Sequence, residues 1–387
     1  MTQATPPRIA IPLGPTSERY RGPILLASGH RPFFLFAGLY AALALPMWLL
    51  AWRGILPLTS TWHGHEMIFG FALAAIAGFL LAAVPKWTNS KPLQGPRVAL
   101  LMALWLLGRV AMWLPGLALL DLLFLPVLAV LLGREILRAG NRRNYGVPVL
   151  LLALWGIDVL FHFGQPNLAL RVATYLVTTL IALIAGRIVP TFTRNALKMA
   201  GDPNHECVTP RWLDVLAVPT VLAVAVTELA APLSQASGLT ALLAALVLGA
   251  RMLRWRTWQT RTLPIVWILH VGYAFVPVGL ALKAVADLGG PIGIFAALHA
   301  LTAGGIGVMI LAVASRAALG HAGLPLQVSR LTVAAYVLVI AGAVLRVAVP
   351  HPHVVLLSGV LWSLGYAVFA AVYWPILTKP RVDGQPG

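Results

Sequence analysis

Residues 64–85 read GHEMIFGFALAAIAGFLLAAVP, and Glu66 is the only formally charged residue among them. A helix needs about 20 mostly apolar residues to cross the hydrocarbon core of a bilayer. The apolar residues follow one another without the alternation of a half-buried strand. An open sheet also leaves unsatisfied edges in lipid. This stretch therefore predicts a membrane-spanning helix.

The rest of the 387-residue chain repeats this pattern, with 59% hydrophobic and only 10% charged residues. Soluble proteins carry about 25% charged residues, and disordered chains are still more polar. The composition therefore excludes both classes and predicts an all-α, polytopic transmembrane bundle. About twelve spans are expected, at residues 33–52, 64–85, 97–114, 117–136, 146–164, 168–189, 212–230, 236–252, 262–282, 292–314, 331–349 and 354–377.

The basic residues predict the orientation of the bundle. The net charge of +17 would suggest nucleic acid if Lys and Arg clustered on a soluble face, but they lie in short gaps between apolar runs. With a cytoplasmic N-terminus, all but five of the 28 Lys and Arg residues lie on the inside. Such asymmetry is the positive-inside signal. It predicts cytoplasmic termini and no nucleic-acid partner.

The predicted organisation is a single twelve-helix transmembrane domain over residues 33–378. A cytoplasmic segment, 1–32, precedes it, and a cytoplasmic tail, 379–387, follows. A loop at 190–211 joins two halves of six helices each. The single cysteine, Cys207, excludes an internal disulfide and any site built from several cysteines.

Ionisable side chains inside spans are costly and usually functional. Five histidines fall at compatible depth in or beside the predicted spans, and imidazoles suit copper, zinc, iron and haem iron. These candidate metal ligands are His63, His65, His162, His270 and His299. A purely structural alternative remains for each of them, such as hydrogen-bonded packing for His270 or a helix start at His63–Glu66.

Two spacings refine this candidate site. His63 and His65 lie about 200° apart on a helix, although a junction between loop and helix would let them converge or let one support the other. Asp158 and His162 are four residues apart and share a helix face, so the carboxylate could orient the imidazole. Asp121 and Asp214 lie near helix ends and have no evident partner, and Arg109 remains inside the third predicted span.

A second pattern lies at the predicted cytoplasmic ends of the sixth and tenth spans. Arginine, asparagine and histidine there could hold carboxylates such as haem propionates, although positive-inside anchoring also explains the arginines. These candidates for cofactor binding are Arg187, Arg194, Asn195, Arg316 and His321. The glycines at 304, 305 and 307 permit close approach of a neighbouring helix or a flat cofactor, and helix packing is the favoured interpretation.

Several blocks of the sequence resemble the NnrS family in order along the chain. They are Trp62–Phe71 (WHGHEMIFGF), His30–Leu35, Gly186–Asn195, Trp267–Tyr273 and His299–His321. The resemblance implies a haem- and copper-containing bacterial membrane protein of the inner membrane, linked to nitric oxide and denitrification. It implies His63, His65, His270, His299 and His321 as ligands, with haem expected to be of the b type.

The leading hypothesis is therefore a metal protein that binds nitric oxide and gives resistance to nitrosative stress. If it is an enzyme, it would be a haem-dependent oxidoreductase of the nitric oxide reductase type, served by an unidentified electron donor. Glu66 and Asp158 are then the candidates for proton delivery. The alternative is a transporter of copper, haem or a small metal-linked solute, since intramembrane ionisable residues also serve a substrate path.

Overall fold

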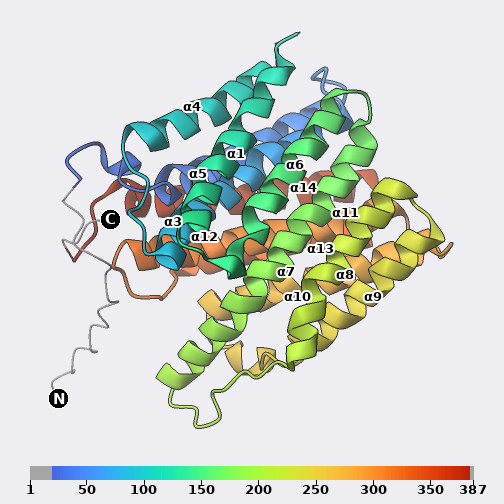
Figure 1. Cartoon of the computed structure of the whole chain (residues 1–387). Coiled ribbons are helices and arrows are strands. Elements are labelled where there is room, and N and C mark those ends of the chain that lie inside the picture. The colour runs from blue at the N-terminus through green and yellow to red at the C-terminus, as the bar shows by residue number, and fades with distance from the viewer. Residues whose placement is uncertain (1–19, 115, 384–387) are drawn as a thin grey trace.

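The computed structural model describes residues 20–114 and 116–383, which fold into a bundle of antiparallel helices with no strand in these ranges (Figure 1). The predicted terminal segments fall partly, and Pro115 wholly, outside the described residues. The α-helices are α1 (His30–Trp52), α2 (Ser60–His65), α3 (Leu73–Thr88), α4 (Pro96–Ala111), α5 (Phe124–Arg138), α6 (Gly146–His162), α7 (Pro166–Met199), α8 (Arg211–Ala230), α9 (Gln235–Met252), α10 (Pro264–Asp287), α11 (Ile294–His299), α12 (Gly307–His321), α13 (Arg330–Ala348) and α14 (Pro352–Thr378).

Two of the long helices contain a π-helical turn. The segment η2 (Glu66–Ala72) joins α2 to α3, and η6 (Ala300–Ile306) joins α11 to α12. The segments on either side of each π-helical turn therefore form one continuous helix, at Ser60–Thr88 and at Ile294–His321. π-Helical turns are rare and occur often at functional sites, and both turns here directly follow a histidine.

The predicted helical bundle is confirmed. Within the described residues, ten helices are long and apolar enough to cross a membrane. The helices α4 and α5, with 16 and 15 residues, are shorter; they lie in the third and fourth predicted spans. Twelve crossings and cytoplasmic termini remain predictions, and the two ends of the bundle are named accordingly: α1 begins at the predicted cytoplasmic end.

The predicted loop between the two halves begins too early. The helix α7 continues through Pro190 to Met199, so the connection before α8 covers only residues 200–210. A polar sequence after Arg194 does not end a helix once that helix has left the hydrocarbon region. The proline costs a hydrogen bond, which neighbouring helices in a bundle can compensate.

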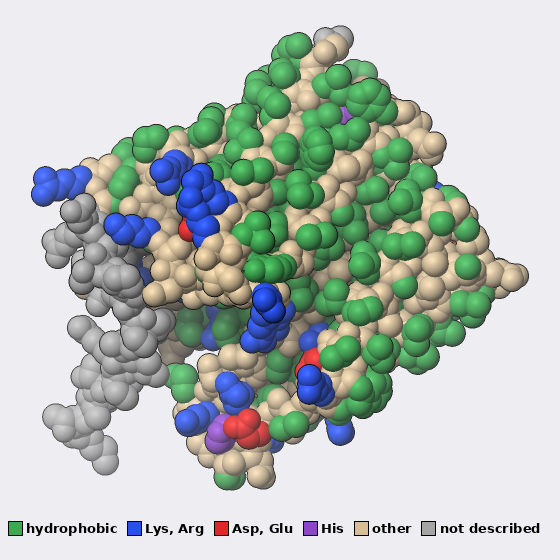
Figure 2. Space-filling view, viewed as in Figure 1, with side chains coloured by type: hydrophobic (Ala, Val, Ile, Leu, Met, Phe, Trp, Pro, Cys, Tyr) green, Lys and Arg blue, Asp and Glu red, His purple; other side chains and the backbone are tan. Residues whose placement is uncertain are grey.

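The outer surface is apolar, as Figure 2 shows on the face in view. Large aliphatic side chains point outward on several helices, including Leu43, Val130 and Leu246, each more than 60% exposed. Patches of this extent are unusual on soluble monomers. Lys and Arg gather toward one end in this view, which agrees with a bundle surrounded by lipid.

Candidate metal centres

His63 and His65 lie on opposite faces of one helix. The hydroxyl of Thr59 caps α2 by accepting a hydrogen bond from the backbone N–H of Trp62 at 3.1 Å. Both histidines therefore fall inside the helix, and the 200° rotation between them applies. The convergent arrangement left open by the sequence is wrong, and each imidazole belongs to a different site.

The imidazole of His65 lies at the centre of a buried polar cluster. Its Nδ1 is 2.9 Å from Glu66 Oε1, and its Nε2 is 3.1 Å from both Asp121 Oδ2 and Asp158 Oδ1. His162 completes the cluster, with Nε2 3.8 Å from Asp158 Oδ1 and 4.0 Å from Asp121 Oδ2. Three segments thus converge on one point: the α2–η2 junction, the turn before α5, and α6, which contributes both Asp158 and His162.

Arg109, the charge left in mid-span by the sequence, holds two of these carboxylates. Its guanidinium donates to Glu66 Oε1 at 2.7 Å and also to Asp121 Oδ1. The hydroxyl of Tyr40 donates to the other oxygen of Glu66. Arg109, Glu66 and Asp121 are buried, at 5% exposure or less, whereas Tyr40 is half-buried. Pairing with Arg109 keeps charge in the interior tolerable.

The π-helical turn η2 makes room for this cluster. A Cβ at Gly70 would lie 2.6 Å from Tyr40 Cε1 and 3.0 Å from a guanidinium nitrogen of Arg109. The carbonyl of Gly70 accepts a hydrogen bond from the indole N–H of Trp105 at 3.0 Å. A π-turn disturbs the regular ladder, and the indole satisfies a carbonyl that lipid could not.

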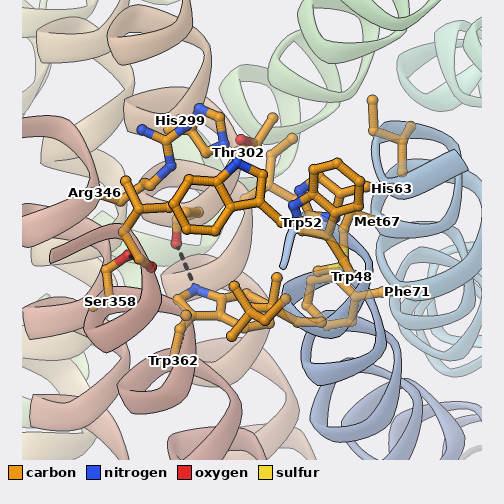
Figure 3. A pocket seen from close by; sticks show the side chains of 18 residues that line it. Trp48, Trp52, His63, Met67, Phe71, His299, Thr302, Arg346, Ser358 and Trp362 are labelled. Atoms are coloured by element: carbon orange, nitrogen blue, oxygen red, sulfur yellow. Dashed lines mark hydrogen bonds between the residues drawn. The ribbon is translucent and has the colours of Figure 1, made fainter. Parts of the chain in front are cut away.

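His63 faces a cavity on the other side of α2, at the predicted outer end. The cavity has a volume of about 140 Å³. His299 from α11 lines it as well, and Figure 3 shows the two imidazoles reaching it from different helices, with Trp52 and Trp362 beside them. The ring of His63 stacks on Trp48 with centroids 5.0 Å apart and an angle of 10°.

The tautomer of His299 leaves one nitrogen available as a ligand. Its Nδ1 lies 2.7 Å from the carbonyl oxygen of Phe295. A carbonyl only accepts hydrogen bonds, so Nδ1 carries the proton and Nε2 keeps its lone pair. This backbone contact is the usual way in which a metal-binding imidazole is oriented.

The second π-helical turn, η6, borders the same cavity. The indole N–H of Trp362 donates to the carbonyl of Ala303 at 3.1 Å, as Trp105 does for η2. Added Cβ atoms at Gly304, Gly305 and Gly307 would meet side chains of α10 and α14 within 2.3–3.2 Å. The glycines therefore serve helix packing, as favoured from the sequence.

His270 lies apart from both centres. It sits in the second turn of α10. The hydroxyl of Thr193 lies 2.8 Å from its Nε2 and that of Thr257 3.0 Å from its Nδ1. Both ring nitrogens thus have hydrogen-bond partners. This arrangement agrees with the alternative in which His270 is a hydrogen-bonded packing residue.

The predicted propionate-binding residues are dispersed at the predicted cytoplasmic end. Arg187 donates to the side chain of Asn144 at 2.7 Å, and Arg194 and Asn195 are exposed. The guanidinium of Arg316 lies over Phe192, 3.9 Å from the ring centroid. No described contact links these residues to one another, and their cofactor role stays a prediction.

His321 belongs to a basic group at the same end. Its ring packs against that of His30, with centroids 4.3 Å apart and the ring planes tilted by 32°. Its Nε2 lies 3.3 Å from Lys86 Nζ. Because an ammonium only donates, this nitrogen accepts and is occupied. The surroundings of His321 are therefore cationic and do not favour a metal ion.

The residues around the cavity fit haem. The imidazoles of His63 and His299 are of the type that binds haem iron. Trp48 and Trp52 supply flat apolar walls, and Arg346 supplies a cation that could meet a carboxylate. Glu66 and Asp158, the predicted proton donors, do not line this cavity; both belong to the cluster around His65.

Sequence reasoning missed Asp121, Arg109 and Arg346 as site residues. A useful signal existed for the first two: opposite charges occur at similar predicted depth, in the third span and early in the fourth. An isolated charge inside a span implies a partner on another helix. Arg346 was counted only toward orientation.

Comparison with known families decides the relationship. The NnrS protein family profile matches residues 24–381, nearly the whole chain. The chain belongs to the NnrS family. No similar sequence was found among curated proteins. This NnrS protein is therefore a multi-helix membrane protein, and both candidate metal centres lie within the matched range.

Proposed function

We propose that this NnrS protein is a haem- and copper-containing protein of the bacterial inner membrane that binds nitric oxide and gives resistance to nitrosative stress. The observation that carries the proposal is the cavity between His63 and His299. It combines a histidine whose free Nε2 is fixed by a backbone contact with aromatic walls and one cation. The family resemblance supplies the expectation of haem, copper and nitric oxide.

The residues around the cavity would have different roles. His299 and His63 are the residues that would hold the haem iron, while Arg346 would pair with a haem carboxylate. Bound haem would supply the metal that takes up the gas. The surrounding indoles exclude water, and nitric oxide, which is small and neutral, can reach a lipid-embedded site without a charged channel.

The test is an anaerobic nitric oxide titration of the purified, reduced protein. The proposal predicts a Soret band that shifts as the gas is added. The haem content of the same sample is then measured by the pyridine haemochrome assay. A colourless protein after expression with ample haem would contradict the proposal, and vesicle uptake of copper or haem by that protein would favour the transport alternative.

A further inference from the structure

The cluster around His65 carries more negative charge than its protein partners neutralise. Glu66, Asp121 and Asp158 are all buried, and Arg109 is the one arginine or lysine that contacts them in the described part of the chain. With both histidines neutral, two negative charges remain. Uncompensated charge is strongly unfavourable away from water, and a divalent cation would cancel it.

The hydrogen bonds of His65 show where such a cation belongs. An ionised carboxylate only accepts, so Glu66 Oε1, at 2.9 Å, places the proton on His65 Nδ1. The other nitrogen, Nε2, lies 3.1 Å from Asp121 Oδ2 and from Asp158 Oδ1. By the same rule it carries a proton while no metal ion is bound, and a bound metal ion would take the place of that proton. Three acceptors facing one another repel unless a positive centre lies between them.

His162 adds a fourth atom that could bind a metal ion at the place between His65, Asp121 and Asp158. Its Nε2 and Asp121 Oδ2 are buried and have no hydrogen-bond partner among the described residues. The four atoms lie within 4.8 Å of one another. In a tetrahedral site, bond lengths of about 2.0–2.2 Å place neighbouring ligand atoms of one metal ion about 3.3–3.6 Å apart. Four of the separations here are 3.1–4.0 Å, and the remaining pairs lie within 4.8 Å, so binding would draw the four side chains closer together.

We propose that His65, Asp121, Asp158 and His162 form a second, non-haem centre that binds one divalent transition-metal ion. Two imidazoles and two carboxylates suit Fe²⁺, Zn²⁺ or Cu²⁺ better than the softer Cu⁺. Glu66 is a positioning residue, because it orients His65 as carboxylates orient metal-binding histidines elsewhere. The centre is separate from the cavity, which none of the four ligands lines.

The experiment uses the full-length protein in lipid nanodiscs after treatment with a chelator. Zn²⁺, Fe²⁺ and Cu²⁺ are added separately, with Fe²⁺ under anaerobic conditions, and bound metal is measured by elemental analysis. For Cu²⁺ the electron paramagnetic resonance spectrum should show coupling to imidazole nitrogen. We expect one ion per chain, and a Glu66→Gln variant should bind it about 10–100-fold more weakly.

Ligand variants and a matched control define the site. Asp121→Asn and His162→Gln should lose more affinity than Glu66→Gln. Glu228→Gln should keep the ion, because Glu228 is an equally buried carboxylate that contacts Arg171 and Lys283 instead of an imidazole. Where an Asp121 variant fails to fold, the nitrogen coupling of the wild-type protein still tests the ligand set.

The outcome separates this centre from the haem proposal. Variants of His63 and His299 should keep the divalent ion even when haem is lost. A folded wild-type protein that binds none of the three ions would overturn the inference and would mean that the cluster is balanced by protons. Equal retention of the ion in wild type and His162→Gln would also overturn it.

Discussion

Replacing Arg109 with methionine would remove the one guanidinium that holds Glu66 and Asp121. The long apolar side chain keeps most of the volume, so the main effect is electrostatic. Both carboxylates are at most 5% exposed, and removing one partner of a buried ion pair costs about 3–5 kcal/mol. We expect Arg109→Met to lower the free energy of unfolding by that amount.

The assay is thermal unfolding of wild type and variant in the same detergent and with the same metal content. Arg138→Met is the matched control, because the side chain of Arg138 is 61% exposed and forms a looser ion pair, at 3.8 Å, with Glu135. Exposed pairs contribute about 0–1 kcal/mol. If Arg109→Met were as stable as Arg138→Met, the account of Arg109 as the electrostatic support of this cluster would be refuted.

Three further predictions concern the packing and the loop. Gly70→Ala should destabilise the protein by about 1–3 kcal/mol through overpacking, whereas Gly156→Ala, with open space at its Cβ, should be neutral or stabilising in the same melting assay. Trp362→Phe should cost about 1–3 kcal/mol by leaving the Ala303 carbonyl unsatisfied, and a stability equal to wild type would refute that role. Burial raises the pKa of the Cys207 thiol. Because alkylation requires the thiolate, labelling of Cys207 near neutral pH should be slower than labelling of a free thiol and should become faster as the pH rises. A labelling rate as fast as that of a free thiol would count against this burial.

The helices could be predicted from sequence because lipid imposes a simple requirement on length and polarity. Every predicted span coincides with a helical segment, and the largest error, the end of α7 at Met199, lies in a polar stretch where hydropathy carries no information. The short helices α4 and α5, with 16 and 15 residues, are those at which the third and fourth predicted spans follow each other most closely.

The candidate sites could be predicted only in part. Helical geometry already implied that His63 and His65 face apart, but the partner on each side is set by tertiary packing. Asp121 and His65 are distant in sequence and meet only because the helices assemble. Likewise, the position of His270 along its span did not show that Thr193 and Thr257 would occupy both of its nitrogens.

The central claim is that haem binds between His63 and His299. Its most direct test is the haem content of His299→Ala and of His270→Ala, measured by pyridine haemochrome on folded protein in the same preparation. The account predicts that His299→Ala loses haem or its nitric oxide-responsive Soret band, while His270→Ala keeps both. Full haem content with an unchanged nitric oxide response in His299→Ala, or loss confined to His270→Ala, would contradict it.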